Sequence, residues 1–194
     1  MAKKTKSRKA SKSRASARKP ARKASAGSAA NGFSQKMQFL NSFEKEHATT
    51  MKVLRAFPAE QAEFRPHPRS QCARELAFTF QLEQMLISLA IKDQLTLGSG
   101  MPKAPSDFLA IVNQFDKDFG DLVELIRKTP EAEFMKTVTF PTGPGQLGQW
   151  PKIQFARFLL SDQIHHRGQY CVYLRMAGGK VPSIYGPSAD EPWT

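Results

Sequence analysis

The sequence KIQFARFLLSDQIHHRGQYCVYLRM occupies residues 152–176, and the character of its side chains varies with the period of an α-helix. Residues three or four apart share one face of a helix, and one face here carries Leu159 together with four polar side chains. These four are Asp162, His166, Gln169 and Tyr173. The glycines Gly178 and Gly179 end the predicted helix. The pattern therefore predicts a long helix that directs polar groups toward the protein interior.

Three earlier segments have the same periodicity. The first begins after Phe33 and ends at Pro58, and the second runs from about residue 71 to residue 97. The third spans about residues 105–128 and has the most regular apolar face. Glu83 is the polar exception on the apolar stripe of the second segment. We expect each of these segments to form a helix that buries one face.

The remaining segments read as connections. KTVTF, at residues 136–140, alternates like a short strand, whereas residues 141–151 contain so many turn formers that we expect a long loop. Residues after the final helix form a predicted extended tail. Four long helices predict an all-α fold, an antiparallel four-helix bundle made by residues 33–194. The sequence leaves open whether the long connections after the first and third helices are crossovers or merely loops.

Residues 1–32 differ sharply in composition from the rest of the chain. They are rich in Lys, Arg, Ser and Ala and contain no acid, so they carry most of the net charge of +12. Such a segment buries too little apolar surface to fold, and we expect it to be disordered. Cations distributed along a flexible chain can follow a phosphate backbone, which predicts non-specific nucleic-acid binding. The alternative is a solvated tail that aids solubility. The basic residues are Lys3, Lys4, Lys6, Arg8, Lys9, Lys12, Arg14, Arg18, Lys19, Arg22 and Lys23.

Composition excludes several other classes of protein. No apolar run approaches the roughly 20 residues that a transmembrane helix requires, so we expect no membrane association. Cys72 and Cys171 are too few for a disulfide framework, and the N-terminus lacks the apolar stretch of a secretory signal. A reducing cytoplasm is the expected compartment.

The polar face of the last helix is the candidate site. Asp162 and His166 lie one helical turn apart, so their side chains can reach a single divalent cation. Helical bundles often hold metals in this way. Gln169 and Tyr173 continue the same face and are expected to line the pocket. The alternative is a hydrogen bond between the Asp162 carboxylate and the His166 imidazole inside the core.

The run DQIHHRGQYCVYLRMAGGKVPSIYGPSADE, at residues 162–191, resembles the C-terminal signature of the DinB/YfiT-like proteins, which are damage-inducible four-helix bundles. EHATTMKVLRAFP (46–58), FRPHPRS (64–70) and RELAFTFQLE (74–83) extend the resemblance to about residues 34–191. It implies a homodimer and one divalent metal, typically nickel or zinc. Three histidines hold that metal in the family.

Carried over to this chain, the last histidine ligand falls on His166. The ligand four residues earlier falls on Asp162, where a histidine is common, and the second-helix ligand falls on Thr79. A threonine hydroxyl is a poor ligand for nickel or zinc, so the site needs another donor. His47, on the inward face of the first helix, and Glu83, one turn after Thr79, are the candidates.

Two neighbours of His166 carry further expectations. Arg167 is predicted to pair with a carboxylate of the C-terminal tail, such as Asp190 or Glu191. Gly168 costs about 1 kcal/mol relative to alanine within a helix, which predicts close packing against another helix. A second subunit is one candidate for that helix, since the resemblance implies a dimer.

Some relatives with this fold are metal-dependent transferases that use low-molecular-weight thiols, in which a metal stabilises the thiolate. Only one of three histidine ligands is kept here, so we expect a non-catalytic or weakly metal-binding protein of this kind with a stress-associated role. Two alternatives stay open. One is a metal-dependent thiol transferase or hydrolase that uses Asp162 and His166, and the other is a nucleoid-associated protein that binds DNA through its tail. The sequence identifies no substrate.

Overall fold

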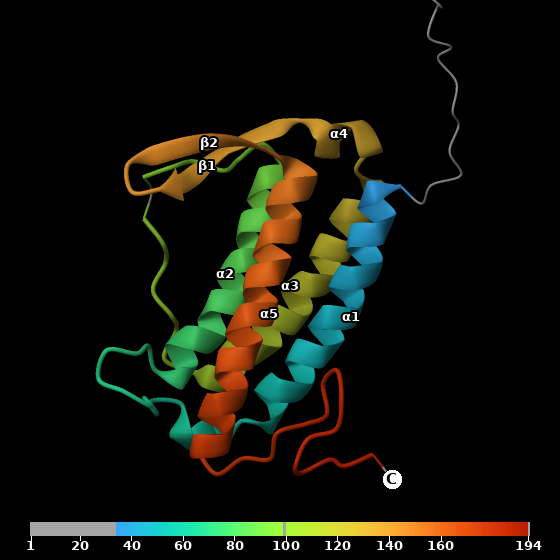
Figure 1. Ribbon diagram of the computed structural model, residues 1–194. Coiled ribbons are helices and arrows are strands. Elements are labelled where there is room, and N and C mark those ends of the chain that lie inside the picture. The colour runs from blue at the N-terminus through green and yellow to red at the C-terminus, as the bar shows by residue number, and fades with distance from the viewer. Residues whose placement is uncertain (1–33, 99, 194) are drawn as a thin grey trace, which may run out of the picture. The chain divides into compact units, whose positions relative to one another are not determined.

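The computed structural model describes residues 34–98 and 100–193 (Figure 1). The predicted basic tail, residues 1–32, lies outside the described residues, so its disorder and its nucleic-acid binding stay predictions. The elements are α1 (Gln35–Ala56), the 3₁₀ helix η1 (Ala59–Gln61), α2 (Ala73–Ile91), α3 (Phe108–Lys128), α4 (Glu131–Met135), β1 (Thr137–Gly143), β2 (Gln146–Pro151) and α5 (Lys152–Met176). None of the described helices combines the length and the apolar character that crossing a membrane requires.

Four of the described helices are long and lie side by side (Figure 1). α1 and α2 each pack against both α3 and α5. The mostly helical fold predicted from periodicity is therefore confirmed.

The directions of these helices depart from the antiparallel prediction. α1 and α3 run in opposite directions, as do α2 and α5, whereas α2 and α3 run in the same direction (Figure 1). The Arg74 guanidinium, near the start of α2, donates to the Ala104 and Pro105 carbonyls just before α3 begins. α1 and α5 also start at the same end, where Arg157 contacts Gln35. Residues 92–107 bring the chain back to that common end of α2 and α3, a crossover that the sequence did not mark.

The core consists of two apolar clusters of the described residues, one toward each end of the long helices. One cluster includes Phe57, Phe80 and Phe115, and the other includes Phe39 and Phe155. Between them along α1, α2 and α5 lies a set of buried polar side chains, which we call the polar layer. It comprises His47, Glu83, Gln84, Gln163 and Arg167.

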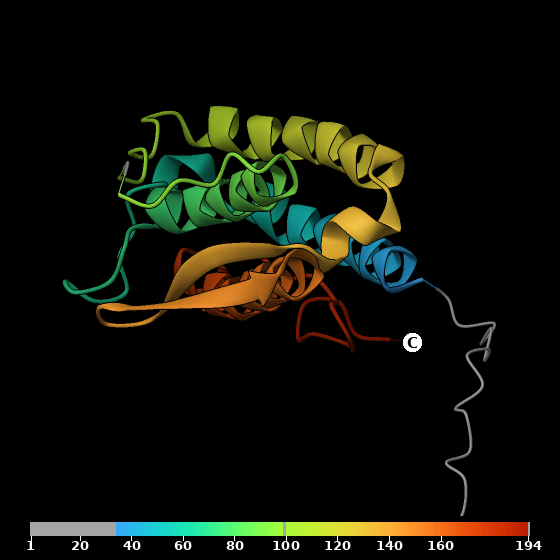
Figure 2. The same ribbon diagram turned by 90° about the horizontal axis from the view of Figure 1, so that it is seen from above.

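A two-stranded sheet crosses the end of the helices where α5 begins and lies alongside α5 (Figure 2). β1 and β2 pair antiparallel from Thr137 opposite Pro151 to Gly143 opposite Gln146. The predicted strand at residues 136–140 is confirmed in its main part, but residues 141–151 form the end of β1, a turn and β2 rather than a long loop. Pairing satisfies the backbone groups of this glycine-rich stretch, and Phe140 packs on Phe155 with ring centroids 4.7 Å apart. The small sheet and α4 go beyond an all-α description.

Capping explains why two predicted helix boundaries moved. α3 begins at Phe108 rather than near residue 105, because the Asp107 carboxylate accepts hydrogen bonds from the Leu109 and Ala110 amides. α2 ends at Ile91 rather than near residue 97. Two residues after this end, Asp93 adopts a positive φ of 57°. The buried Lys152 ammonium stabilises this end by donating to the Ile91 carbonyl and pairing with the Asp93 carboxylate.

Candidate metal centre

Three potential metal ligands converge where α2 faces α5. Glu83 comes from α2, and Asp162 and His166 come from adjacent turns of α5. His166 Nε2 lies 3.5 Å from Glu83 Oε1 and 3.6 Å from Asp162 Oδ1. One ligand atom of each residue lies within 4.8 Å of the other two, close enough for one ion to contact all three. We call these residues the Glu83 cluster.

The Glu83 side chain is buried without the partners that a carboxylate requires. The residue is only 4% exposed, and neither carboxylate oxygen has a hydrogen-bond partner among the described residues. Burial, and then the nearby negative charge of Asp162, raises the pKa of the Glu83 carboxyl to about 9. An unpaired buried carboxyl destabilises the fold unless a proton or a cation neutralises it. The donor set therefore fits a divalent cation.

The other two members of the cluster can be reached from solvent. The side chain of Asp162 is 39% exposed and that of His166 is 19% exposed. His166 Nδ1 lies 3.4 Å from Gln169 Oε1, which leaves Nε2 directed at the two carboxylates. A hydrogen bond to the distal nitrogen commonly orients an imidazole ligand in this way. An ion held here would thus keep a coordination position open to a small molecule.

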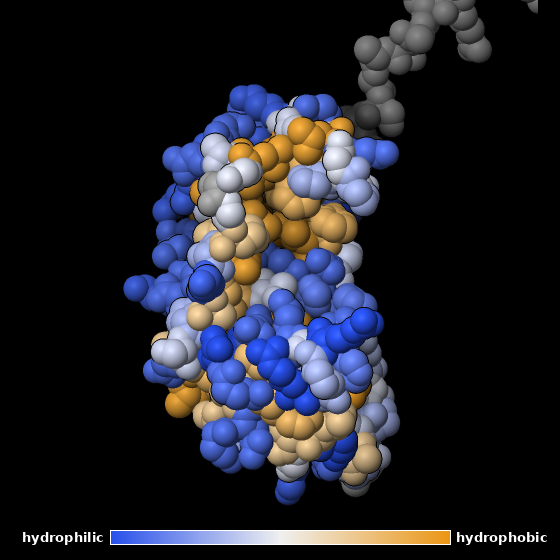
Figure 3. All heavy atoms as spheres, turned by 90° about the vertical axis from the view of Figure 1, so that its left-hand side faces the viewer, coloured by the Kyte–Doolittle hydropathy of each residue, from blue (hydrophilic) through white to orange (hydrophobic). Residues whose placement is uncertain are grey.

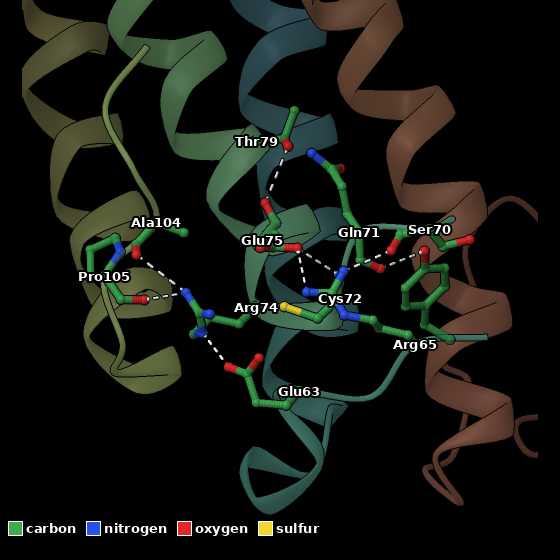
Figure 4. A network of polar contacts seen from close by, with 11 residues as sticks. Glu63, Arg65, Ser70, Gln71, Cys72, Arg74, Glu75, Thr79, Ala104 and Pro105 are labelled. Carbon is green, nitrogen blue, oxygen red and sulfur yellow. Dashed lines mark hydrogen bonds and ion pairs between the residues drawn. The ribbon is translucent and has the colours of Figure 1, made fainter. Parts of the chain in front are cut away.

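Thr79 occupies the position where the family resemblance places a ligand, and its hydroxyl is used within α2. Its hydroxyl donates to the Glu75 carbonyl at 3.3 Å (Figure 4), as threonines inside helices often do. Glu83 lies one turn further along α2 and supplies the carboxylate instead. Of the two candidates for the missing donor, the structure brings Glu83 to Asp162 and His166.

His47, the second candidate, lies elsewhere in the polar layer. Its Nε2 is 3.0 Å from Asp116 Oδ1 on α3, and Gln84 Nε2 is 3.2 Å from its Nδ1. The ring stacks on Phe119 with centroids 3.7 Å apart. Asp116 also accepts from Arg55 at 2.7 Å. The structure therefore places His47 in a separate group of side chains, which we call the His47 cluster, and does not bring it to the candidate ion.

The prediction that Arg167 pairs with an acidic residue of the C-terminal tail was wrong. The buried Arg167 guanidinium pairs with Glu46 of α1 at 2.7 Å, and it donates to the Tyr185 hydroxyl at 2.6 Å. Asp190 pairs with Arg175 instead. The reason is orientation: Arg167 points inward from α5 and meets α1 and Tyr185 of the tail, whereas Arg175 is exposed near the end of that helix and meets Asp190.

Tyr173, a predicted pocket residue, contacts the segment just before α2. The Tyr173 hydroxyl donates to the Gln71 carbonyl near the start of α2, so it supports that end of the fold. Figure 4 shows the network there, in which Glu75 accepts from the Cys72 amide and caps the helix.

Gly168 is exposed. No described atom outside its own helical turn lies within 4 Å of the position that an added Cβ would take. The close packing predicted for Gly168 therefore does not occur within the described chain.

Sequence reasoning missed the buried Gln163, whose amide donates to the Phe80 carbonyl at 3.4 Å. It also missed Gln84 and Asp116, the partners of His47. Gln84 directly follows Glu83, so a second polar residue at that point of an otherwise apolar helix was a usable signal. Nothing in the local sequence marked Asp116, which lies on another helix.

Comparison with known proteins identifies the family. The model of the DinB family matches residues 29–193. A DinB-like protein from Bacillus cereus ATCC 10987 has a similar solved structure, with a TM-score of 0.62 and 23% identity over 76% of this chain and 95% of that chain. The DinB-like protein YjoA from Bacillus subtilis gives a TM-score of 0.59 and 14% identity over 74% and 94%.

A curated relative is similar over a shorter stretch. The uncharacterized protein YrdA of Bacillus subtilis (strain 168) is 49% identical over 43 residues, which is 22% of this chain and 26% of that protein. The matched stretch thus spans about a quarter of the length of this relative.

Proposed function

This chain belongs to the DinB family, and on that premise we propose that it binds one divalent metal ion through Glu83, Asp162 and His166. The observation that carries the proposal is the buried Glu83 carboxylate, which has no hydrogen-bond partner among the described residues and faces an imidazole. A cation between these groups would supply the missing partner.

Zinc or nickel is the metal that we propose. One imidazole nitrogen and two carboxylate oxygens are donors that both ions accept. Two of the three family histidines are replaced by oxygen donors or displaced, so the site is degenerate and the affinity is weak by the standards of a structural zinc site. The proposed role is therefore metal binding without assigned catalysis, in a stress-associated protein.

Metal-dependent thiol transfer or hydrolysis is the second candidate, and the accessible face of the cluster favours it. A bound ion would act there as a Lewis acid toward a group that enters from solvent. The chain itself supplies the positioning: Gln169 holds the ring of His166, and Phe80 packs against that ring edge-on at 6.4 Å. These contacts fix the imidazole and limit the approach of water from the core side.

A titration with metal tests the first proposal. Full-length protein stripped with a chelator should bind about one Zn²⁺ or Ni²⁺ per chain in calorimetry, and it should melt at a higher temperature with the ion present. At a free ion concentration 100 times the Kd, the expected gain in stability is about 2.7 kcal/mol. Unchanged melting and no binding heat at millimolar zinc would contradict the proposal.

We also propose the homodimer that the family resemblance implies, with the exposed face of α5 as its interface. Gly168 leaves space on that face, and Val172, one turn further, is an exposed hydrophobic residue. Light scattering of the full chain and of Val172→Asp tests this: the wild type should have twice the mass of the variant. A monomeric wild type would contradict it.

A further inference from the structure

An apolar hollow lies between α2, the described residues 95–98 and 100–101, and β1. Its volume is about 390 Å³, which falls within the range of small-molecule sites. Figure 3 shows hydrophobic side chains gathered around a recess in the upper half of this face. Its apolar lining comprises Leu86, Leu95, Leu97, Met101, Phe140 and Pro141.

The chemistry of the lining selects an uncharged occupant. No charged side chain borders the hollow among the described residues, and its single polar side chain is that of Thr96. Leu97 is 43% exposed and Met101 is 57% exposed, so both would gain from contact with an apolar group. A charged group would lose its hydration there without gaining a partner.

The walls of the hollow are connected to the two helices that carry the Glu83 cluster. Leu86 follows Glu83 by three residues on α2, which places it on the same side of the helix and about 4.5 Å further along the axis. Phe140, on the opposite wall, packs against Phe155 of α5, which precedes Asp162 by about two turns. Leu86 and Glu83 thus share α2, and Phe140 contacts the helix that carries Asp162 and His166, about 10 Å along its axis from Asp162.

We propose that this hollow binds the apolar part of a small amphiphilic anion whose charged group approaches the ion at the Glu83 cluster. The inference rests on the proposed metal site and adds a substrate class to it: an anionic head joined to an aromatic ring or a short alkyl chain. The head meets a cation and the exposed edge of Asp162 and His166, while the apolar part displaces water from Leu86, Leu97 and Phe140.

Two fluorinated probes test the proposal by ¹⁹F NMR on the full-length protein. One is 4-(4-fluorophenyl)butyrate, which has an anionic head, and the other is the neutral 4-fluorobenzyl alcohol. We expect Zn²⁺ to tighten binding of the butyrate at least about tenfold and to leave binding of the alcohol unchanged. The proposal would be overturned if the alcohol does not bind, or if the affinity of the butyrate is the same with and without zinc.

Leu97→Asp locates the apolar site. The variant introduces a carboxylate at an exposed position of the hollow, so folding should be preserved and both probes should bind at least about tenfold more weakly. Leu109→Asp, at an exposed position of α3, is the matched control and should change neither affinity. Equal probe affinities in the two variants would overturn the hollow as the site.

The zinc titration separates the two levels of inference. Zinc affinity should be the same in the wild type and in Leu97→Asp, because Leu97 does not belong to the Glu83 cluster. If zinc binds but the probes do not, the amphiphile proposal fails and the metal site stands. If zinc does not bind while the alcohol does, the metal proposal fails. The claim that the ligand carries an anionic head then fails with it.

Discussion

Two histidine–carboxylate clusters of opposite character are built, among the described residues, around His47 and Glu83 of the polar layer. In the His47 cluster each ring nitrogen has a partner, and Asp116 also pairs with the Arg55 guanidinium. In the Glu83 cluster two carboxylates face a single imidazole, and no described Lys or Arg forms an ion pair with either one. The difference teaches that charge balance, rather than the presence of a histidine, separates a structural cluster from one suited to binding a cation.

Electrostatics sharpen the contrast. Burial lowers the pKa of the His47 imidazole, although the Asp116 carboxylate partly opposes the shift, so the neutral ring is favoured. Burial and the charge of Asp162 raise the pKa of Glu83 to about 9. The first cluster is thus stable as it is, whereas the second needs a positive partner before Glu83 can ionise at neutral pH.

The largest expected effect concerns metal affinity. Glu83→Gln removes an anionic ligand while preserving the shape of the side chain, so zinc should bind at least about 100-fold more weakly in calorimetry. His47→Gln should leave zinc affinity unchanged, because His47 already has partners on two other helices. Circular dichroism confirms that both variants are folded. The contrast between the clusters breaks down if the two variants bind zinc equally well.

The second effect concerns stability without metal, measured by urea unfolding in chelator. His47→Ala should cost about 2 kcal/mol, since it removes the stacking on Phe119 and leaves Asp116 and Gln84 without a partner. His166→Ala should cost less than about 1 kcal/mol, because the imidazole is partly exposed and faces carboxylates that it does not closely pair with. A larger loss in His166→Ala would show that the Glu83 cluster also supports the fold.

The third effect is a slope: the response of metal-free stability to each unit of pH. The folded-state pKa of His47 lies below 6.5, so the unfolded chain takes up the proton first, and stability should fall as the pH drops below about 6.5. The folded-state pKa of Glu83 lies above 4.5, so the unfolded chain releases the proton first, and stability should fall as the pH rises from 4.5 to about 9.

Each of these slopes is at most about 1.4 kcal/mol per pH unit. Thermal melts in chelator across this pH range measure both. His47→Gln should flatten the acidic fall, which also involves the facing charges of Asp116 and Arg55, and Glu83→Gln should flatten the alkaline one. Variants that leave both slopes unchanged would assign the pH response to other groups.

Much of the fold followed from hydrophobic periodicity, because a buried face repeats every three or four residues along α1, α2, α3 and α5. The boundaries depended on contacts that periodicity does not contain. α2 ends early because Lys152, about 60 residues later in the chain, caps its last turn. The directions of the helices depended on the path of residues 92–107, which carry no apolar repeat.

The candidate site was predictable where its members share a helix or interrupt an apolar stripe. Asp162 and His166 are four residues apart, and Glu83 is polar at a core position. His47 is likewise a polar residue on an apolar helix face, and its contact with Asp116 on α3 is what separates it from the candidate metal ligands. Arg167 was assigned a nearby tail carboxylate because sequence proximity was the sole guide, but its partner Glu46 lies 121 residues earlier.

The contact between Glu46, Arg167 and Tyr185 also bears on the order in which the chain folds during synthesis. Tyr185 donates to the Glu46 carboxylate across 139 residues, so α1 leaves the ribosome long before this partner is made. Until then α1 exposes the side of Glu46 and Thr50 that Arg167 covers. Tyr185 must therefore have left the ribosome before α1 can be fully enclosed.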